Sequence, residues 1–382
     1  MRIMHLSRAS LMLHHFVLPV AQRQREEGHY VCFCGSNDVH SRQLQAHGFD
    51  VFVHGLQRSL NVFLLAREIA RVRRILQHSR IDMLVCHSPL GAGIGRIAAG
   101  LVGVPCVVYF AHGLPCAPGQ NWLKWGFWFF IEKALSTLAH AVIVMNEYDE
   151  NLCRTRLYRD PGRVFRVPGM GVDVHRFRPL DDIAKQQAVR QGLGIPPDAF
   201  IVLCSAALIP QKGVFVLQEA ASHIIKRNKH IYFLLAGQGP CEGQLRRENE
   251  RLGLTKQFKV LGWRSDVDQL LYASDLFVLP TFYFEGLPVS ILEAMACGKP
   301  VVATKHRGCE DAVVHGDTGL LVPIRSSDKL SQAILQLASD APLRNSMGDA
   351  GRLRVAARFE KSHCTDIIVA TLKEIWRMTE EA

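Results

Sequence analysis

Short apolar runs alternate with longer amphipathic helical patterns along this chain, and the whole alternation occurs twice. Runs rich in valine and isoleucine that are separated by helical patterns predict parallel strands, in sheets covered by helices on both faces. We therefore expect an α/β protein with two doubly wound, Rossmann-like domains. The expected strands are residues 2–6, 30–34, 82–86, 106–110 and 141–145 in the first set, and 200–204, 231–236, 258–262, 276–280 and 300–304 in the second.

The length of 382 residues also favours two domains, because it exceeds what one ordinary core accommodates. A connection marked by proline and glycine, residues 166–180, follows the first set of strands. We expect an N-terminal domain over residues 1–170 and a C-terminal domain over 171–362. A last helix over 363–382 is expected to cross back to the N-terminal domain. Ligands of such sheets bind at the carboxyl ends of the strands.

Composition excludes several classes of protein. No run of eighteen apolar residues occurs, and polar residues interrupt the apolar start of the chain, so we expect neither a membrane-spanning helix nor a signal peptide. The 11 cysteines lack paired spacing, which favours a reducing cytoplasm. The net charge of +10 is concentrated in residues 1–170, with 19 basic against 11 acidic residues, so this half is expected to meet an anionic partner.

Two acids lie eight positions apart in the stretch FYFEGLPVSILEAMACGKP, residues 282–300. Glu285 follows an expected strand, and Glu293 falls inside a helix that a Gly-Leu-Pro turn begins, with the proline in its first turn. The amides of Gly286 and Leu287, with the helix dipole, favour an anion such as phosphate. Carboxylates on either side would accept hydrogen bonds from hydroxyl groups, as a nucleotide sugar requires. The alternative is an acid that serves the helix dipole and a second acid paired in the core.

The same stretch resembles the E-x7-E region of retaining glycosyltransferases of family 4, which have the GT-B fold. The resemblance covers nearly the whole chain and is greatest to the branch that builds capsule, lipopolysaccharide O-antigen and lipid-linked oligosaccharides. It implies two Rossmann-like domains that face each other across a cleft. Its further motifs, in order, are YFAHGLP (109–115), RVPGMGVDVHRF (166–177), ALIPQKGV (207–214), LLAGQGP (234–240), LGWRSDV (261–267) and ASDLFVLP (273–280).

The resemblance implies a role for each matching residue. Glu293 would hold the ribose hydroxyls and Glu285 those of the transferred sugar, while Lys212 would neutralise the diphosphate. His112 would reach the sugar, and Gly262 and Trp263 would lie near the base. The candidate catalytic residues are therefore His112, Lys212 and Glu285. The candidate donor-binding residues are Lys212, Gly237, Gly262, Trp263, Glu285, Gly286, Leu287 and Glu293.

One position departs from the family pattern, because Ala207 occupies the place of a usual arginine. Arg264 and Arg307, both in loops near strand ends, are the expected substitutes in the diphosphate clamp. The family needs neither metal nor cofactor, since lysine and helix dipoles stabilise the leaving diphosphate. The nucleotide sugar is a substrate.

The histidines of the first domain allow another interpretation. His14, His15, His87 and His112 fall in loops after strands or early in helices, where they could cluster, but their spacing is unlike that of a zinc site. We therefore predict no metal site. His15 is a candidate contact to the acceptor.

Two segments are candidates for contact with a membrane surface. Residues 121–138 hold Trp122, Trp125 and Trp128 and are apolar on nearly every side, as in an interfacial segment or a core helix. Residues 66–80 form a second, basic segment, either a site for anionic lipid or a solvated face. Nucleic acid is not expected, because aromatic residues are not interleaved with the basic ones. The basic segment repeats Arg67, Arg71 and Arg74 along one face.

Together these features predict a cytoplasmic enzyme, peripheral on the inner face of the cytoplasmic membrane. It would move a sugar from a nucleotide donor, UDP-linked, to a lipid-linked or growing saccharide in surface polysaccharide biosynthesis, with retention of the anomeric configuration. The alternatives are a sugar-nucleotide epimerase or hydrolase on the same fold, and a non-catalytic subunit that binds a nucleotide sugar.

Overall fold

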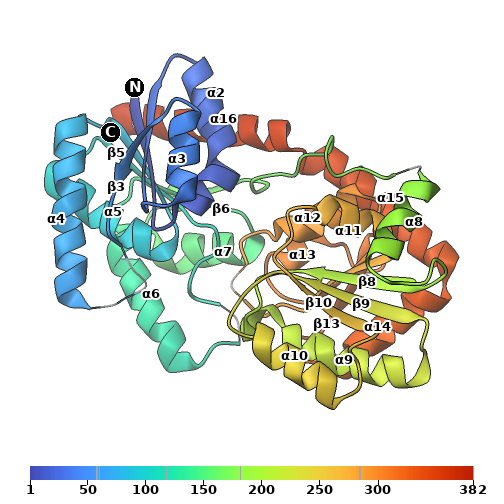
Figure 1. The fold of residues 1–382 in the computed structure, drawn as a ribbon. Coiled ribbons are helices and arrows are strands. Elements are labelled where there is room, and N and C mark those ends of the chain that lie inside the picture. Colours follow the sequence, from blue (N-terminus) through green and yellow to red (C-terminus); the bar gives the residue numbers. More distant parts are fainter. Residues whose placement is uncertain (57–58, 60, 118, 181, 284, 382) are drawn as a thin grey trace. The chain divides into compact units, whose positions relative to one another are not determined.

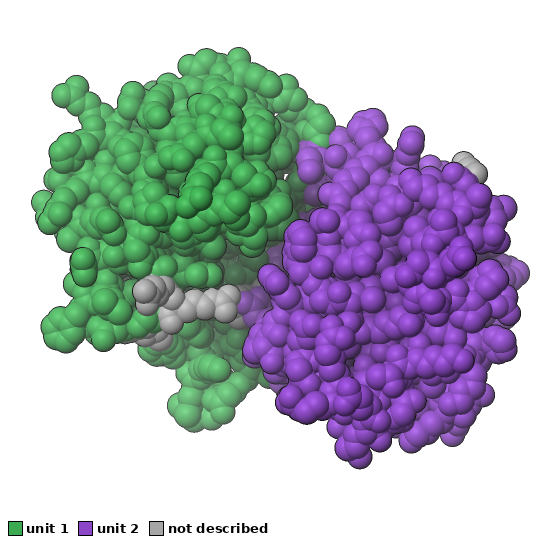
Figure 2. All heavy atoms as spheres, in the orientation of Figure 1, with its two compact units in different colours: residues 1–170, 362–382 green, residues 171–361 purple. Residues whose placement is uncertain are grey.

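The protein falls into two compact units (Figure 2). The computed structural model describes residues 1–56, 59, 61–117, 119–180, 182–283 and 285–381. Unit 1 comprises residues 1–170 and 362–382, and unit 2 comprises residues 171–361. The second boundary lies one residue before the expected position, and Ala382 of the expected last helix lies outside the described residues.

Within the described residues, unit 1 holds a seven-stranded parallel sheet of order β3-β2-β1-β4-β5-β6-β7 (Figure 1). The central strands β4 and β5 are buried at every position, as expected for a parallel sheet covered on both faces. The strands are β1 (Arg2–Ser7), β2 (Tyr30–Gly35), β3 (Asp50–Val53), β4 (Met83–His87), β5 (Cys106–Phe110), β6 (Ala141–Val144) and β7 (Val164–Arg166).

The helices of unit 1 follow the strands and include two short π-helical segments. They are α1 (Ser10–Met12), the π-helix η1 (Leu13–Val17), α2 (Leu18–Glu26), α3 (Val39–Ala46), α4 (Val62–Ser79), α5 (Pro89–Val102), α6 (Trp122–Ser136), α7 (Glu147–Leu152), the π-helix η2 (Cys153–Leu157) and the 3-10 helix η3 (Pro161–Arg163). The buried Arg96 of α5 pairs with the buried Glu132 of α6 at 2.9 Å, and its guanidinium lies over the ring of Tyr109.

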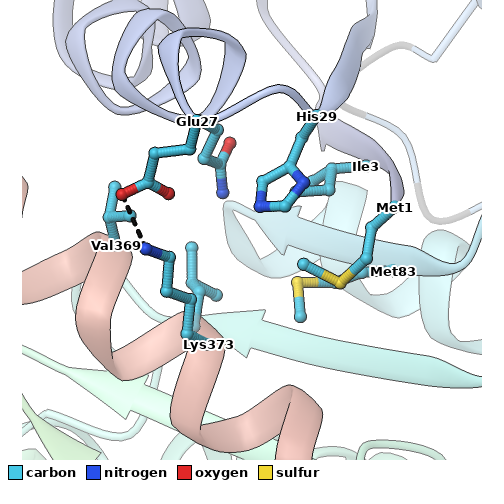
Figure 3. Close-up of a pocket in the computed structure, with 9 residues that line it drawn as sticks. Met1, Ile3, Glu27, His29, Met83, Val369 and Lys373 are labelled. Atoms are coloured by element: carbon cyan, nitrogen blue, oxygen red, sulfur yellow. Dashed lines mark hydrogen bonds and ion pairs between the residues drawn. The ribbon is translucent and has the colours of Figure 1, made fainter.

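The last helix, α16 (Lys361–Glu380), packs beside α2 in unit 1 (Figure 1). Arg23 pairs with Asp366 at 3.0 Å, and Lys373 pairs with Glu27 at 2.6 Å (Figure 3). A small pocket beside the second ion pair is lined by residues at the amino ends of β1 and β4. Ligands of doubly wound sheets bind at the opposite, carboxyl ends of the strands. This pocket therefore does not lie at the edge of the unit 1 sheet where a ligand is expected.

In the part of the chain that is described, unit 2 holds a six-stranded parallel sheet of order β10-β9-β8-β11-β12-β13. Its strands are β8 (Phe200–Ser205), β9 (Ile231–Ala236), β10 (Phe258–Gly262), β11 (Leu276–Leu279), β12 (Val301–Thr304) and β13 (Gly319–Val322). Its helices are α8 (Ile183–Gly192), the 3-10 helix η4 (Pro210–Lys212), α9 (Val214–Arg227), α10 (Glu242–Arg251), α11 (Val267–Ala273), α12 (Val289–Ala296), α13 (Cys309–Ala312), α14 (Ser327–Ser339) and α15 (Ala341–Arg358).

The predicted pair of doubly wound sheets is confirmed, and each expected strand is present to within one or two residues. The sequence analysis missed β3, β7 and β13, and all three lie at sheet edges. They have only three or four residues each, and β3 is partly exposed throughout. A short edge strand needs less apolar sequence, because one side has no neighbouring strand.

Candidate active site

A lysine and an acid from two loops of unit 2 form an ion pair at one edge of its sheet. Lys212 ends η4, after β8, and Glu285 follows β11. Since β8 and β11 are parallel neighbours, their carboxyl ends meet at the same edge. The Nζ atom of Lys212 donates to Oε1 of Glu285, and Oγ1 of Thr281 donates to the same oxygen at 2.9 Å. Sequence reasoning missed Thr281, although it is the second residue after the end of β11.

The backbone at Gly213, the residue after Lys212, leaves no room for a side chain. Gly213 has φ of 72°, and an added Cβ would lie 2.0 Å from the carbonyl oxygen of Pro280. Only glycine combines a positive φ with so close a backbone approach. The Lys-Gly pair therefore holds the ammonium group directly against the loop that carries Glu285.

A second glycine turn follows β9. Gly237 has φ of 144°, and an added Cβ would lie 1.9 Å from the carbonyl oxygen of Ala206. Its amide donates to the carbonyl of Gly262 at 2.7 Å, so the ends of β9 and β10 are joined. Trp263 follows Gly262 and is 65% exposed. These expected donor residues thus lie in loops at the carboxyl ends of neighbouring strands.

The start of α12 differs from the prediction. The first helical residue is Val289, and Pro288 is the N-cap instead of a first-turn residue. Gly286 and Leu287 therefore belong to the turn before the helix, and their amides are not those of its first turn. The turn is closely packed, because a Cβ on Gly308 would lie 2.7 Å from the carbonyl oxygen of Gly286.

Glu293 lies in α12 with its carboxyl group largely enclosed by protein. Burial raises its pKa to about 7, and the positive charges of Arg176 and Lys361 oppose this shift only in part. Burial makes the ionised form of this carboxyl group unfavourable, and hydroxyl groups that donate hydrogen bonds to it would stabilise that form. Perturbed pKa values of this kind are typical of binding and catalytic sites.

The two arginines proposed to replace the missing family arginine have different surroundings. Ala207 itself is exposed. Arg264 forms a bidentate ion pair with Asp266, with contacts of 2.7 and 2.6 Å, so its charge is already matched. Arg307 is buried, and the residue after it, Gly308, lies against the turn of Glu285 and Gly286. Of the two, Arg307 lies nearer the Lys212 pair along the sheet, since it follows β12, the neighbour of β11.

His112 of unit 1 ends a chain of three histidines, of which the sequence analysis suggested His87 but missed His5. Nε2 of His112 lies 3.0 Å from Nδ1 of His87, and Nε2 of His87 lies 3.1 Å from Nδ1 of His5. His5 in turn lies 2.8 Å from the side-chain oxygen of Gln24. The only signal for His5 was a polar residue inside an apolar strand.

The chain determines which nitrogen of His112 carries its proton. An amide oxygen only accepts, so Nε2 of His5 donates to Gln24; Nε2 of His87 then donates to Nδ1 of His5, and Nε2 of His112 donates to Nδ1 of His87. His112 therefore keeps its lone pair on Nδ1. Burial lowers the pKa of His5 and of His112 to about 4, and that of His87 well below its usual value, so all three rings are neutral at neutral pH.

The structure separates the histidines that the sequence suggested as one cluster. His15 lies in η1, with its ring against His14 and His40, and not in the chain that reaches His112. His87, by contrast, does contact His112. The four suggested histidines thus belong to two groups, His14 with His15 and His87 with His112.

The side chains proposed to contact a membrane differ in how far they are exposed. Trp122 is 76% exposed, whereas Trp125 and Trp128 are partly buried and pack against the core of unit 1. The basic face is as expected, since Arg67, Arg71 and Arg74 are all exposed. No helix in the described ranges is long and apolar enough to cross a membrane.

Comparison with solved structures supports the architecture. HepE from Anabaena has a TM-score of 0.82 at 23% identity, over 98% of this chain and 100% of that one. The sucrose-phosphate synthase of Thermosynechococcus elongatus has a TM-score of 0.80 at 19% identity, over 99% and 100%. The two parallel sheets thus have the GT-B fold of glycosyltransferases.

Comparison with known sequences then gives the family. Residues 13–169 match the Glycosyl transferase 4-like domain, and residues 185–354 match Glycosyl transferases group 1. The UDP-Gal:alpha-D-GlcNAc-diphosphoundecaprenol alpha-1,3-galactosyltransferase of Escherichia coli is 30% identical, over 76% of this chain and 75% of that protein. The N,N'-diacetylbacillosaminyl-diphospho-undecaprenol alpha-1,3-N-acetylgalactosaminyltransferase of Campylobacter jejuni is 27% identical, over 90% and 91%. The chain belongs to the group 1, family 4 glycosyltransferases, and it is a glycosyltransferase.

Proposed function

We propose that this enzyme transfers a sugar from a UDP-sugar to a lipid-linked saccharide in surface glycan biosynthesis, with retention of the anomeric configuration. The two relatives named above support the acceptor, since both names specify a diphosphoundecaprenol-linked sugar. The name of the first also specifies UDP-Gal as donor and an alpha product. An alpha product from an alpha-linked donor corresponds to retention.

The observation that carries the proposal is the contact between Lys212 and Glu285 in loops at one sheet edge. In the free enzyme each charge is matched by the other. A bound donor would break the ion pair between Lys212 and Glu285, because its diphosphate attracts the ammonium group and its sugar hydroxyls donate hydrogen bonds to the carboxylate. Both groups are partly buried, so their interactions with a bound donor would be stronger than in water.

In the proposed reaction, an acceptor hydroxyl oxygen bonds to the anomeric carbon as the bond from that carbon to the diphosphate oxygen breaks. The hydroxyl proton passes to the departing phosphate on the same face. Lys212 stabilises the charge that develops on the diphosphate, and His112 is proposed to accept a hydrogen bond from a sugar hydroxyl through Nδ1. Glu293 is proposed to hold the ribose hydroxyls, and Arg307 to complete the diphosphate clamp in place of Ala207. No protein base, metal or cofactor takes part in the proposed step.

A transfer assay tests the proposal. The enzyme is given a panel of UDP- and GDP-sugars, with and without a polyprenyl-diphosphate-linked acceptor sugar, and the products are separated and their anomeric configuration read by NMR. We expect acceptor-dependent release of UDP and an alpha product. Release without acceptor would favour the hydrolase, an altered donor sugar would favour the epimerase, and a beta product would exclude retention.

Two matched lysine variants locate the chemistry. Lys212→Met removes the charge that faces the diphosphate, and we expect kcat to fall by about 10²–10³. Lys226→Met makes the same replacement at an exposed position of α9 and should leave kcat within about twofold. Equal activity of the two variants would exclude Lys212 from the reaction.

We also propose a peripheral contact with the cytoplasmic face of the membrane. On α6, Trp122 is 76% and Phe130 is 72% exposed, and Phe63 of α4 is 87% exposed. Large exposed aromatic residues suit the boundary between headgroups and hydrocarbon, and the exposed basic face of α4 suits anionic headgroups. In liposome flotation, the wild type should float with anionic vesicles, and Trp122→Ser with Phe130→Ser should reduce the recovered fraction. Equal recovery with anionic, neutral and no vesicles would contradict this contact.

A further inference from the structure

Three histidines of unit 1, none of them used in the proposed reaction, converge at one place. His14 and His15 lie in the π-helix η1, and His40 lies at the start of α3, which packs against η1. One ring nitrogen from each of the three lies within 4.8 Å of the others. The rings of His14 and His15 are 5.0 Å apart between centroids, and those of His15 and His40 are 5.2 Å apart.

The backbone under two of these histidines is unusual. π-Helical turns are rare and occur frequently at functional sites. In η1 this turn carries consecutive histidines whose rings meet edge to face, instead of fanning out as neighbours on a regular helix do. A fourth ring, that of His47 after α3, has its centroid 6.1 Å from that of His14.

The hydrogen bond of His40 leaves one of its imidazole lone pairs for a ligand. His40 Nδ1 lies 3.0 Å from the side-chain oxygen of Gln43, which only accepts, so Nδ1 carries the proton and Nε2 the lone pair. Such an outer partner is the usual way in which proteins orient a ligating histidine. Nδ1 of His14 is shielded from solvent and has no hydrogen-bond partner within the described part of the chain.

The spacing of the rings also suits a cation, because imidazole nitrogens are common ligands of zinc and similar ions. Two zinc-bound nitrogens lie about 3.3 Å apart when each bond is about 2.0 Å, so small side-chain rotations bring these rings into range.

We infer that His14, His15 and His40 form a binding site for one divalent transition-metal ion of the zinc class, with His47 as a neighbouring ligand. This site is separate from the proposed donor chemistry, which uses no metal. It also gives His15 a different role from the expected contact to the acceptor. The π-helix and the Gln43 contact are then the features that hold the ligands in place.

The test is Zn²⁺ binding to the untagged full-length chain, measured by isothermal titration calorimetry after removal of metal with a chelator. We expect one Zn²⁺ per chain, and binding at least about tenfold weaker for His15→Ala and for His40→Ala. His230→Ala removes an exposed histidine of unit 2 that lies beside Asp198, and it should bind as the wild type does. Thermal unfolding in chelator shows whether each variant is folded, and His40→Gln replaces any alanine variant that is not.

A second readout distinguishes a built site from scattered surface binding. Co²⁺ should give visible absorption in the wild type that is lost in the His15→Ala, His40→Ala double variant, and Zn²⁺ should displace it. No Zn²⁺ binding, or equal binding by the wild type and the double variant, would overturn the inference.

Discussion

Replacing Glu293 with glutamine should remove the loss of stability that this residue causes as the pH rises from 5 to 8. The pKa of Glu293 in the folded protein is about 7, whereas its ordinary value is 4.5. A group whose pKa is raised by folding favours the folded state when it is protonated. Its contribution is therefore complete below about pH 4.5, declines between pH 4.5 and 7, and is lost above pH 7.

The size of the effect follows from the shift. Each unit of pKa difference corresponds to about 1.4 kcal/mol, so the full shift amounts to roughly 3 kcal/mol. Between pH 5 and pH 8 the difference in unfolding free energy between Glu293→Gln and the wild type should move by about 2 to 3 kcal/mol in favour of the variant. The amide keeps the shape of the carboxylic acid but never ionises.

Urea unfolding at both pH values, followed by circular dichroism, measures this difference. Glu219→Gln makes the same change at an exposed position of α9 and is the control for the amide itself. A difference between Glu293→Gln and the wild type that is the same at pH 5 and pH 8 would refute the reasoning. If the prediction holds, the ionised carboxyl group costs stability, and donor hydroxyls would recover that cost on binding.

Three further substitutions test the structure elsewhere. Gly237→Ala should lower the melting temperature by several degrees, because its Cβ would lie 1.9 Å from a backbone oxygen. Gly243→Ala in α10 is the control and should leave the melting temperature unchanged. Equal melting temperatures for the two variants would contradict the close contact. Arg96→Met should cost about 3–5 kcal/mol of unfolding free energy by leaving Glu132 buried alone, and Glu132→Gln in the same chain should recover much of this loss in urea unfolding. His87→Leu breaks the histidine chain and should lower kcat/KM by about tenfold without changing UDP affinity by calorimetry; unchanged kinetics would make the chain structural only.

The sequence was most informative where local pattern and burial coincide. The inner strands are apolar along their whole length because both faces of a parallel sheet are covered, and this made them predictable. The edge strands β3, β7 and β13 are short and less constrained, and they were missed. The start of α12 was predicted too early, because Pro288 has extended backbone angles, with φ of −73° and ψ of 107°, and precedes the first helical residue.

The sequence by itself determined the two doubly wound sheets, the family and the residue types of the proposed donor site, since these depend on periodicity and on motifs of neighbouring residues. Only the tertiary structure decided which distant side chains meet. His5 and His87 are 82 positions apart, yet they are joined because β1 and β4 are neighbours in the sheet. The same holds for Lys212 with Glu285, and for His14 and His15 with His40. Strand order and helix packing bring these pairs together, and no local pattern in the chain records that order.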